Sequence, residues 1–291
     1  LILLLFFLFS NVSFANDFNF ETSKIEVLND GNLVLATDGK AISLDNSLEI
    51  QAMNFEYIKN LNLLKASQGI AFIKPDNIKI EFNEMEVDQS KSTLKAENKV
   101  KIIDKSKDLT IETETIFFDR KTHIIKSSTN SILKDSINNT LKTTYFSYDL
   151  ETNILKMKDA NLKDPENNNI KIEIAFMNTV SKKLFGKDVN IDLNNKSFNE
   201  KNEPRLKGNS ITYDNDNTEI TKGVFTTCKR RNDKCPPWQL TAKKIQHNKK
   251  NKVINYKNAW LKVYDIPVIY FPKFFHPDPT VKRQSGFLSP K

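Results

Sequence analysis

The sequence has few of the residues on which most active sites depend. Its 291 residues include three histidines and two cysteines. The histidines, His123, His247 and His276, lie far apart in the chain, and no GxSxG elbow, HExxH helix, phosphate-binding glycine loop or calcium loop is present. Acidic pairs such as Glu84 with Glu86 occupy alternating positions, which is typical of a solvated strand face. We therefore expect a protein that is not an enzyme and that binds no cofactor and no metal.

Glycine is also scarce, at seven residues, and no segment after residue 15 has the apolar period of an amphipathic helix. Apolar residues instead alternate with polar ones, as at 78–82, 170–174 and 189–193. Such alternation places one face of a strand on an apolar interior and the other face in water. The turns must then use Asn, Asp, Ser and Lys, and the Asp-Gly pairs at 30–31 and 38–39 are the clearest hairpin signals. The sequence predicts an all-β, antiparallel fold.

A repeat of about 30 residues runs through the chain between residues 50 and 260. An aromatic or aliphatic residue precedes a polar turn, and a second apolar segment follows the turn. The recurring residues are Tyr57, Val87, Phe118, Tyr148, Tyr213 and His247. The first four are spaced by 30, 31 and 30 residues, and the last two by 34. This period predicts stacked units, either as an open jelly roll with a groove inside a folded-over sheet, or as a parallel β-helix with an enzyme cleft on its flank.

The first residues predict an export signal. Residues 1–15 form a short apolar run that ends with small residues at Ser13 and Ala15, as in a signal peptide cleaved after Ala15. A transmembrane helix is the alternative, but the apolar run of residues 1–9 falls short of the roughly 20 residues that a span requires. The rest of the chain is then expected in an oxidising compartment, where disulfides persist.

The chain is basic, with a formal net charge of +8 and a pI of about 9.2, and most of the excess is lysine. A basic chain can bind a polyanion such as nucleic acid, an anionic membrane or a phosphorylated glycolipid. Alternatively, scattered lysines keep strand surfaces solvated and protect sheet edges from aggregation. An export signal argues against nucleic acid as a partner.

The two cysteines, Cys228 and Cys235, enclose six residues in CKRRNDKC. They could form a small disulfide ring if their Cα atoms approach within about 4.4 to 6.8 Å. A zinc site is the alternative, but two cysteines without a second pair supply too few ligands.

Short motifs in the last quarter of the chain follow one another in a specific order. They are TTC at 226–228, PPW at 236–238, NAWLKV at 258–263, IPVIYFP at 266–272 and RQSGFLSP at 283–290. In this order they resemble the end of the periplasmic domain of the LptD (OstA) family, the outer-membrane lipopolysaccharide-assembly proteins. The resemblance implies a signal peptide at 1–15, an OstA-like jelly roll at 16–262, and a connector at 263–291 that leads into a β-barrel.

The resemblance favours the open jelly roll, a fold that it implies is shared with the periplasmic bridge protein LptA and the inner-membrane protein LptC. It implies lipopolysaccharide transport at the outer membrane, with this portion in the periplasm. An LptA-like bridge would dock at the N-terminal edge, within residues 20–57, and deliver acyl chains to an apolar groove. The groove would pass them to a barrel plugged by an LptE-like lipoprotein.

Alternation along the strands identifies the residues that would line this groove. They are Ile80, Phe82, Ile102, Phe118, Phe146, Ile172, Ile174 and Ile191. An ordinary dry core would use the same residue types. The remaining alternatives are a free-standing lipopolysaccharide carrier of the LptA type and a secreted β-helix enzyme that acts on polysaccharides.

The connector contains Pro267, Pro272 and Pro290. Prolines at this density exclude a helix and remove ladder donors, so we expect an extended connector with interrupted strands. The resemblance implies that this connector lies near a lateral opening for lipid, and that Pro290 weakens the pairing of the first barrel strand. It also implies a third fate for Cys228, which is a disulfide with cysteines of the barrel.

Overall fold

The computed structural model describes residues 18–74, 76–135, 139–164, 167–194, 202–214, 216–230, 236–277 and 281. The predicted signal peptide at 1–15, Cys235 and Pro290 lie outside these residues. The strands join in one 19-stranded sheet, and every neighbouring pair is antiparallel. The prediction of an all-β, antiparallel fold is therefore confirmed. No helix within the described ranges is long and apolar enough to cross a membrane.

The strands vary in length from four residues to twelve. They are β1 (Phe18–Leu28), β2 (Leu33–Ser43), β3 (Leu48–Ile58), β4 (Leu63–Ile73), β5 (Ile78–Asp88), β6 (Thr93–Asp104), β7 (Leu109–Asp119), β8 (Ile124–Ser127), β9 (Ser131–Lys134), β10 (Thr140–Thr143), β11 (Tyr145–Asp149), β12 (Ile154–Lys163), β13 (Asn169–Asn178), β14 (Leu184–Asp192), β15 (Arg205–Tyr213), β16 (Asn217–Thr226), β17 (Trp238–Asn248), β18 (Val253–Val263) and β19 (Ile266–Pro277). Two short 3₁₀ helices, η1 (Lys59–Leu61) and η2 (Lys105–Lys107), lie in turns.

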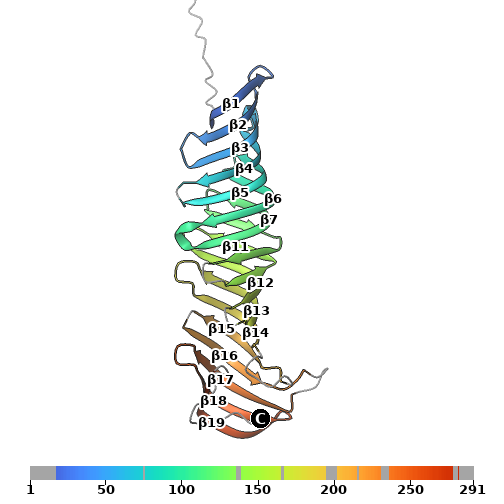
Figure 1. Ribbon diagram of the computed structural model, residues 1–291, viewed down its shortest axis with the longest axis vertical. Helices are drawn as coiled ribbons and strands as arrows, with labels where there is room; N and C mark the ends of the chain where they lie inside the picture. Colours follow the sequence, from blue (N-terminus) through green and yellow to red (C-terminus); the bar gives the residue numbers. More distant parts are fainter. Residues whose placement is uncertain are drawn as a thin grey trace, which may run out of the picture.

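The strands form a long stack that begins at β1 and ends at β19 (Figure 1). Strands that follow one another in the sequence pair with one another along the stack, with two local exceptions. β8 and β9 lie end to end along β7, and β10 and β11 lie end to end along β12. A β-helix would need parallel neighbours. The structure therefore excludes the β-helix alternative.

The 30-residue repeat corresponds to two consecutive strands and the turn between them. In the β7–β8 turn, the Asp119 carboxylate accepts hydrogen bonds from the backbone N–H of Lys121 at 2.9 Å and of Thr122 at 3.2 Å. The same turn is made by Asp88, Asp149, Asn178, Asp214 and Asn248. We call the row of these turns the Asx-turn edge, and the row at the other strand ends the opposite edge. Met177, which precedes the turn residue Asn178, is the member of the repeat between Tyr148 and Tyr213 that the sequence analysis misses.

Each full-length strand bends once, along a line down the stack that we call the corner. In β5, Phe82 is buried, the next two residues are exposed, and Met85 is buried again. In many strands a residue at this break has a positive φ. These residues are Asp38 in β2, Gln68 in β4, Asn98 and Lys99 in β6, Asp159 in β12, Asp188 in β14, Lys222 in β16 and Asn258 in β18. A bulge of this kind bends a strand, so the same face points inward on both sides of the corner. The sheet thus folds over into two layers.

Of the two Asp-Gly pairs, one forms the predicted hairpin and the other does not. Asp30 and Gly31 lie in the β1–β2 turn with φ values of 51° and 89°. Asp38, with a φ of 49°, lies inside β2 at the corner, so the hairpin predicted at 38–39 is wrong. Both sites need a residue with a positive φ, a backbone conformation that Gly, Asn and Asp adopt more readily than other residues. An Asp-Gly pair alone does not distinguish them.

The predicted connector is also different from expectation in its first half. Residues Ile266–Pro277 form β19, which pairs with β18 along its length apart from one register shift at Leu261/Lys262. Proline is tolerated because β19 is paired on one side only in the described chain, and Pro272 lies opposite Asn258, where the ladder is already broken at the corner. This part of the chain is a strand of the stack and not an interrupted extended segment.

The corner uses most of the few glycines. Gly39, Gly69, Gly186, Gly208 and Gly223 all lie beside it. A Cβ at Gly69 would stand 2.3 Å from the carbonyl oxygen of Gln51 and 2.7 Å from the Cβ of Ala52. Side chains of neighbouring strands therefore meet too closely at the corner for a larger residue.

We predict that Gly69→Ala lowers the free energy of unfolding by about 1–3 kcal/mol, because the added methyl forces the backbone of β3 to move. Its control is Gly31→Asn, where a side chain meets nothing within 4 Å and the positive φ suits asparagine. Urea denaturation of both variants gives the comparison. Equal stabilities of Gly69→Ala and the parent chain would contradict the close packing at the corner.

Candidate functional site: the interior and the mouth of the folded sheet

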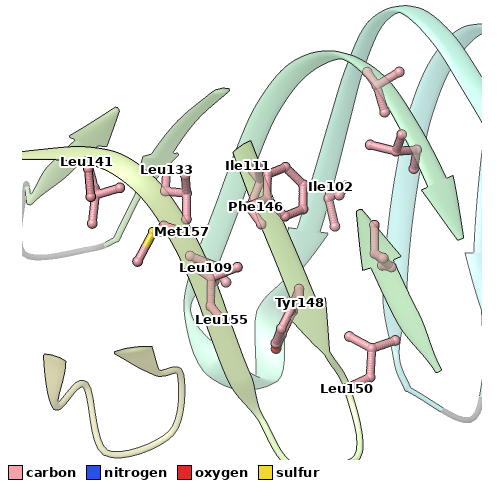
Figure 2. Packing of buried hydrophobic residues seen from close by; sticks show 14 of the residues in the cluster. Ile102, Leu109, Ile111, Leu133, Leu141, Phe146, Tyr148, Leu150, Leu155 and Met157 are labelled. Atoms are coloured by element: carbon pink, nitrogen blue, oxygen red, sulfur yellow. The ribbon is translucent and has the colours of Figure 1, made fainter. Parts of the chain in front are cut away.

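One apolar cluster runs between the two layers through the whole stack. Around β6 to β12 the side chains of Ile102, Ile111, Leu133, Phe146 and Met157 gather between the strands (Figure 2). Seven of the eight residues predicted to line a groove lie in this cluster, each with at most 4% of its surface exposed: Ile80, Phe82, Ile102, Phe118, Phe146, Ile172 and Ile191. Their inward orientation follows the alternation in the sequence. Their contact with lipid stays a prediction.

Ile174 is the exception among the predicted lining residues. It is half-buried, while Ile172 and Ala175 are buried. The break in alternation at the corner falls between these two residues, so the inward position passes from 174 to 175. The prediction that Ile174 faces the interior is wrong, because simple alternation takes no account of the corner.

Within the described residues, a small cavity of about 40 Å³ lies among Leu109, Leu133, Leu141, Leu162 and Leu184 near the middle of the stack, and it extends to Lys134 and Lys182 at the edges of the sheet. A space of this size accommodates a few water molecules at most. The two layers are therefore packed against each other in this structure.

A cluster of hydroxyl groups interrupts the apolar lining at the corner between β7, β8 and β9. Thr113 Oγ1 lies 3.0 Å from Ser127 Oγ and 2.8 Å from Thr129 Oγ1, and Ser131 Oγ donates to Thr113 at 2.9 Å. Thr113, Ser127 and Ser131 are buried. These hydroxyls satisfy one another at the point where the gap between β8 and β9 breaks the ladder.

Opposite the corner, the two edges of the sheet face each other along a line that we call the mouth. Asp76, in the β4–β5 turn of the opposite edge, lies 3.4 Å from Nδ1 of His123 on the Asx-turn edge. Farther along, the hydroxyl of Tyr148 on the Asx-turn edge donates to Asp104 on the opposite edge at 3.1 Å. The facing turns are several strands apart in the ladder, so the two layers are offset along the stack.

Asp104 is the most buried charged group at the mouth, with a side-chain exposure of 0%. It accepts hydrogen bonds from Ser106 Oγ at 2.6 Å and from Lys107 Nζ at 3.0 Å, in addition to Tyr148. Burial raises the pKa of the Asp104 carboxyl, but the hydrogen bonds from Ser106 and Lys107 and the charge of Lys107 outweigh it, so that the pKa lies below its ordinary value. The Tyr148 hydroxyl also lies 3.2 Å from Thr179 Oγ1. This cluster therefore connects the turns that follow β6, β11 and β13.

Two more basic residues reach across the mouth. Lys182, in the β13–β14 turn, donates to the backbone carbonyl of Asp108 at 3.2 Å and to that of Lys107. Burial lowers the pKa of the Arg120 guanidinium, and the negative charge of Asp45, on the opposite edge, partly offsets this effect. Arg120 donates to Gln89 through Nη2, while its buried Nε has no hydrogen-bond partner. The mouth is thus held by side chains, not by a backbone ladder.

The turns of the Asx-turn edge carry a row of basic residues beside the mouth. They are Lys59, Lys91, Arg120, Lys121, Lys182, Lys183, Lys249, Lys250 and Lys252. Successive turns on one edge are two strand spacings apart, or about 10 Å. These turns also carry Asp88, Asp119, Asp149, Glu151, Asp214 and Asp216, so the positive charge gathers at 120–121, 182–183 and 249–252 and does not form an unbroken row.

The histidines and cysteines do not form a site within the described residues. His123 lies in the β7–β8 turn, His247 in β17, and His276 in β19, where its Nε2 lies 2.9 Å from the hydroxyl of Tyr256. No three His, Cys, Asp or Glu side chains in the described ranges are grouped to hold a metal ion. Cys228 lies 3.7 Å from the carbonyl oxygen of Trp238, and Cys235 lies outside the described residues, so every pairing of Cys228 stays a prediction.

Part of this chain is similar in sequence to known proteins. No protein-family model matches the chain. It is similar to the LPS-assembly protein LptD of Pseudomonas fluorescens, with 34% identity over 89 residues, which are 30% of this chain and 9% of that protein. The LptD proteins of Shewanella sp. and Shewanella oneidensis are each 41% identical over 76 residues, which are 26% of this chain and 9% of each relative.

These matches confirm the resemblance to LptD that the terminal motifs predict, over a segment that spans about a tenth of the relatives' length. Among solved structures, LptH of Pseudomonas aeruginosa, the LptA-homologous periplasmic component of its lipopolysaccharide transport device, matches 38% of this chain and 81% of its own. The identity is 13% and the TM-score 0.34.

We predict that Asp104→Asn lowers the free energy of unfolding at pH 7 by about 1–3 kcal/mol, because the buried hydrogen bonds lose their charged acceptor. Since the pKa of Asp104 is lower in the folded chain than its value of about 3.9 when unfolded, its contribution is present above about pH 4 and is lost as the pH falls further. The difference in melting temperature between the two chains should therefore be smaller at pH 3 than at pH 7. The exposed Asp30→Asn change is the control, and a pH-independent difference for Asp104→Asn would contradict the argument.

Proposed function

We propose that this chain is the periplasmic part of an LptD-like lipopolysaccharide-assembly protein and carries lipid acyl chains between its two layers. The observation that supports it most directly is a single apolar interior that continues through the whole stack in a chain similar to LptD. Exposure of an acyl chain to water costs about 0.8 kcal/mol per methylene. An interior of repeated apolar rungs removes this cost without the need for any specific hydrogen bond.

The local basic clusters at 120–121, 182–183 and 249–252 on the Asx-turn edge are consistent with a phosphorylated glycolipid as the cargo. With acyl chains between the layers, an anionic headgroup would lie outside the mouth, beside residues such as Lys121 and Lys182. Positive charge at this position would attract phosphate groups and orient the lipid. In this proposal the chain binds and transfers lipid and catalyses no reaction, as the relatives' name of assembly protein also suggests.

A photocrosslinking experiment tests this function. A photoreactive amino acid at Phe82, Phe118 or Ile172 should capture lipopolysaccharide, because these positions face the interior. The same group at Lys79, Glu173 or Ile174 should capture much less. Ile174 is the sharpest control, since it is apolar, lies on the same strand as Ile172, and differs in facing away from the interior. Equal capture at Ile172 and Ile174 would reject an interior site.

We also propose that an LptA-like bridge protein docks at β1. Among the residues that the structure describes, β1 in the predicted docking region of 20–57 is paired on one side only, whereas β2 is paired with both β1 and β3. Ile25 and Val27 occupy the half of β1 nearest the Asx-turn edge and are 52% and 56% exposed. Because the two layers are offset, this half of β1 extends beyond the other layer and leaves the end of the interior open. A partner strand could extend both the sheet and the apolar path.

This docking predicts different effects for prolines in β1 and β2. Ile25→Pro and Glu26→Pro each remove one backbone N–H, and one of the two N–H groups points away from β2 because successive N–H groups alternate. That variant should remain folded and lose at least tenfold in affinity for an LptA-like bridge protein, measured by calorimetry. Proline at Val34, in β2, should instead unfold the end of the stack. Full affinity in both β1 variants, with the fold verified by circular dichroism, would place the docking surface elsewhere.

The other end of the stack is proposed to lead toward the membrane translocon. Its outward side carries Trp260 and Tyr270, whose rings lie 5.0 Å apart, together with the exposed Tyr264 and Ile266. Amphipathic rings of this kind concentrate at membrane interfaces. In this proposal Pro267 and Pro272 limit further pairing at the outer side of β19, Pro290 has its role in the connector, and an LptE-like lipoprotein plugs the barrel. The location is then the outer membrane, with this portion in the periplasm.

A further inference from the structure

A single row of outward side chains runs along the outer face of the layer that carries the opposite edge. Each member of the row is the cross-strand partner of the next, from Glu21 in β1 to Tyr270 in β19. The row lies near the corner, and the corner is on the far side of the molecule from the mouth. This face is therefore separate both from the interior and from the basic clusters of the Asx-turn edge.

The two halves of this row differ in charge. In the first half glutamates accompany the lysines, and Lys40 forms an ion pair with Glu21 at 2.9 Å. Lys101 likewise lies between Glu81 and Glu112 in the register. In the second half lysine alternates with asparagine, so that positive charge is balanced along the first half and unbalanced along the second. The alternating residues, on β10 and β12 to β15, are Lys142, Asn161, Lys171, Asn190 and Lys207.

The three lysines of the second half are regularly spaced. Lys142, Lys171 and Lys207 follow one another at two strand spacings, or about 10 Å. Their side chains are exposed, and no carboxylate of the described chain lies within ion-pair distance of them. A linear polymer with one negative charge at a similar interval would therefore match all three lysines at once.

A hollow of about 370 Å³ opens beside the middle of these lysines, toward the corner. Amide side chains both donate and accept hydrogen bonds, carboxylates accept them, and an ammonium group donates them. A mixture of these groups suits a ligand with many hydroxyl groups, such as a sugar. The same carboxylates would repel a peptide with dense negative charge. The polar lining consists of Asp159, Asn161, Lys171, Glu173, Asp188 and Asn190.

We propose that the five alternating residues and the hollow form a glycan face. Its ligand is a linear, β-linked amino-sugar strand with one carboxylate per disaccharide, as in a bacterial cell wall. The strand runs along the stack, with its carboxylates on Lys142, Lys171 and Lys207 and its hydroxyl and acetamido groups in the hollow. This ligand is distinct from the lipid cargo, since the proposed lipid site lies on the inner side of the sheet. Such binding would anchor the stack to the wall and goes beyond the proposed transport.

Calorimetry with defined glycans tests the glycan face. The first probe is a preparation of cell-wall glycan strands from which an amidase has removed the peptides, so that each disaccharide keeps one carboxylate. Chitohexaose, which has the same linkage and no carboxylate, should bind about fivefold more weakly. Lys171→Gln combined with Lys207→Gln should weaken binding of the charged strands about tenfold, because two charged hydrogen bonds are lost. Lys101→Gln is the matched control in the balanced half of the row and should leave the affinity unchanged.

A second variant tests the hollow independently of charge. Asn190→Ala removes one amide from the hollow and should weaken binding of both the charged strands and chitohexaose by about fivefold. Its control is Asn255→Ala, an outward asparagine of the other layer, which should change neither affinity. Equal affinities for Asn190→Ala and the parent chain would show that the hollow does not hold the sugar.

Three other results would overturn the glycan face. The first is no measurable binding of the cell-wall strands to the parent chain. The second is equally tight binding of poly-L-glutamate, which would indicate a site for any polyanion. The third is tighter binding of the lipid-free polysaccharide released from lipopolysaccharide, which would assign this face to the cargo. Capture of lipopolysaccharide by a photoreactive group at Ile172 is independent of these measurements, so failure of the glycan face leaves the proposed function intact.

Discussion

The structure depends on one constraint. In each full-length strand the alternation of inward and outward residues shifts once, and these shifts line up along the corner. With unbroken alternation, β5 would place Ile78, Ile80 and Phe82 on one face and Met85 and Val87 on the other. The sheet would then expose apolar residues on both sides. The break at the corner brings both halves of each strand onto the same inner face, and the left-handed residues Asp38 to Asn258 make that break possible in the strands that leave the Asx-turn edge. The two layers, the interior and the mouth all follow from it.

The connections in this fold are strongly directional. Backbone ladders bind each strand to its neighbours, so the stack behaves as a one-dimensional array in which each unit contacts the next. Across the mouth, the contacts are isolated groups such as His123 with Asp76 and Lys182 with the carbonyl of Asp108. The two layers are held mainly by the apolar contacts of the interior, which are non-directional, whereas the strands are held by continuous backbone ladders.

The sequence predicts the parts of this structure that depend on local pattern. Alternation places Phe82 and Ile102 correctly in the interior, and the repeat locates the Asx turns, because each turn needs a side-chain acceptor at a fixed spacing from the strand. It fails at Ile174, where the corner shifts the phase, and at Asp38, where the same left-handed residue serves a bend instead of a turn. Both errors come from one cause. The corner leaves no separate signal in the sequence, since two consecutive polar residues in a strand resemble an ordinary irregularity.

The contacts at the mouth could not be predicted from the sequence for a different reason. Tyr148 is visible as a member of the repeat, but nothing in the sequence indicates that its hydroxyl meets Asp104, which lies 44 residues earlier. That pairing depends on how far one layer is offset along the stack relative to the other, and the offset is the sum of the twist of many strands. The same offset explains why Ile25 and Val27 stay exposed at one end and Ile269 at the other, since each end of the stack has a half-strand without a facing layer.

In the proposed function, movement of an acyl chain through the interior would depend on the similarity of successive rungs. Apolar contacts are non-directional and scale with the area removed from water. An acyl chain that leaves the rung of Ile80 for the rung of Ile102 therefore exchanges one set of contacts for an equivalent set, with little net change in free energy. The hydroxyl cluster around Thr113 and Ser131 interrupts this lining, and its hydroxyl groups are already paired with one another at the corner. An acyl chain on the mouth side of the interior would pass it without breaking those hydrogen bonds.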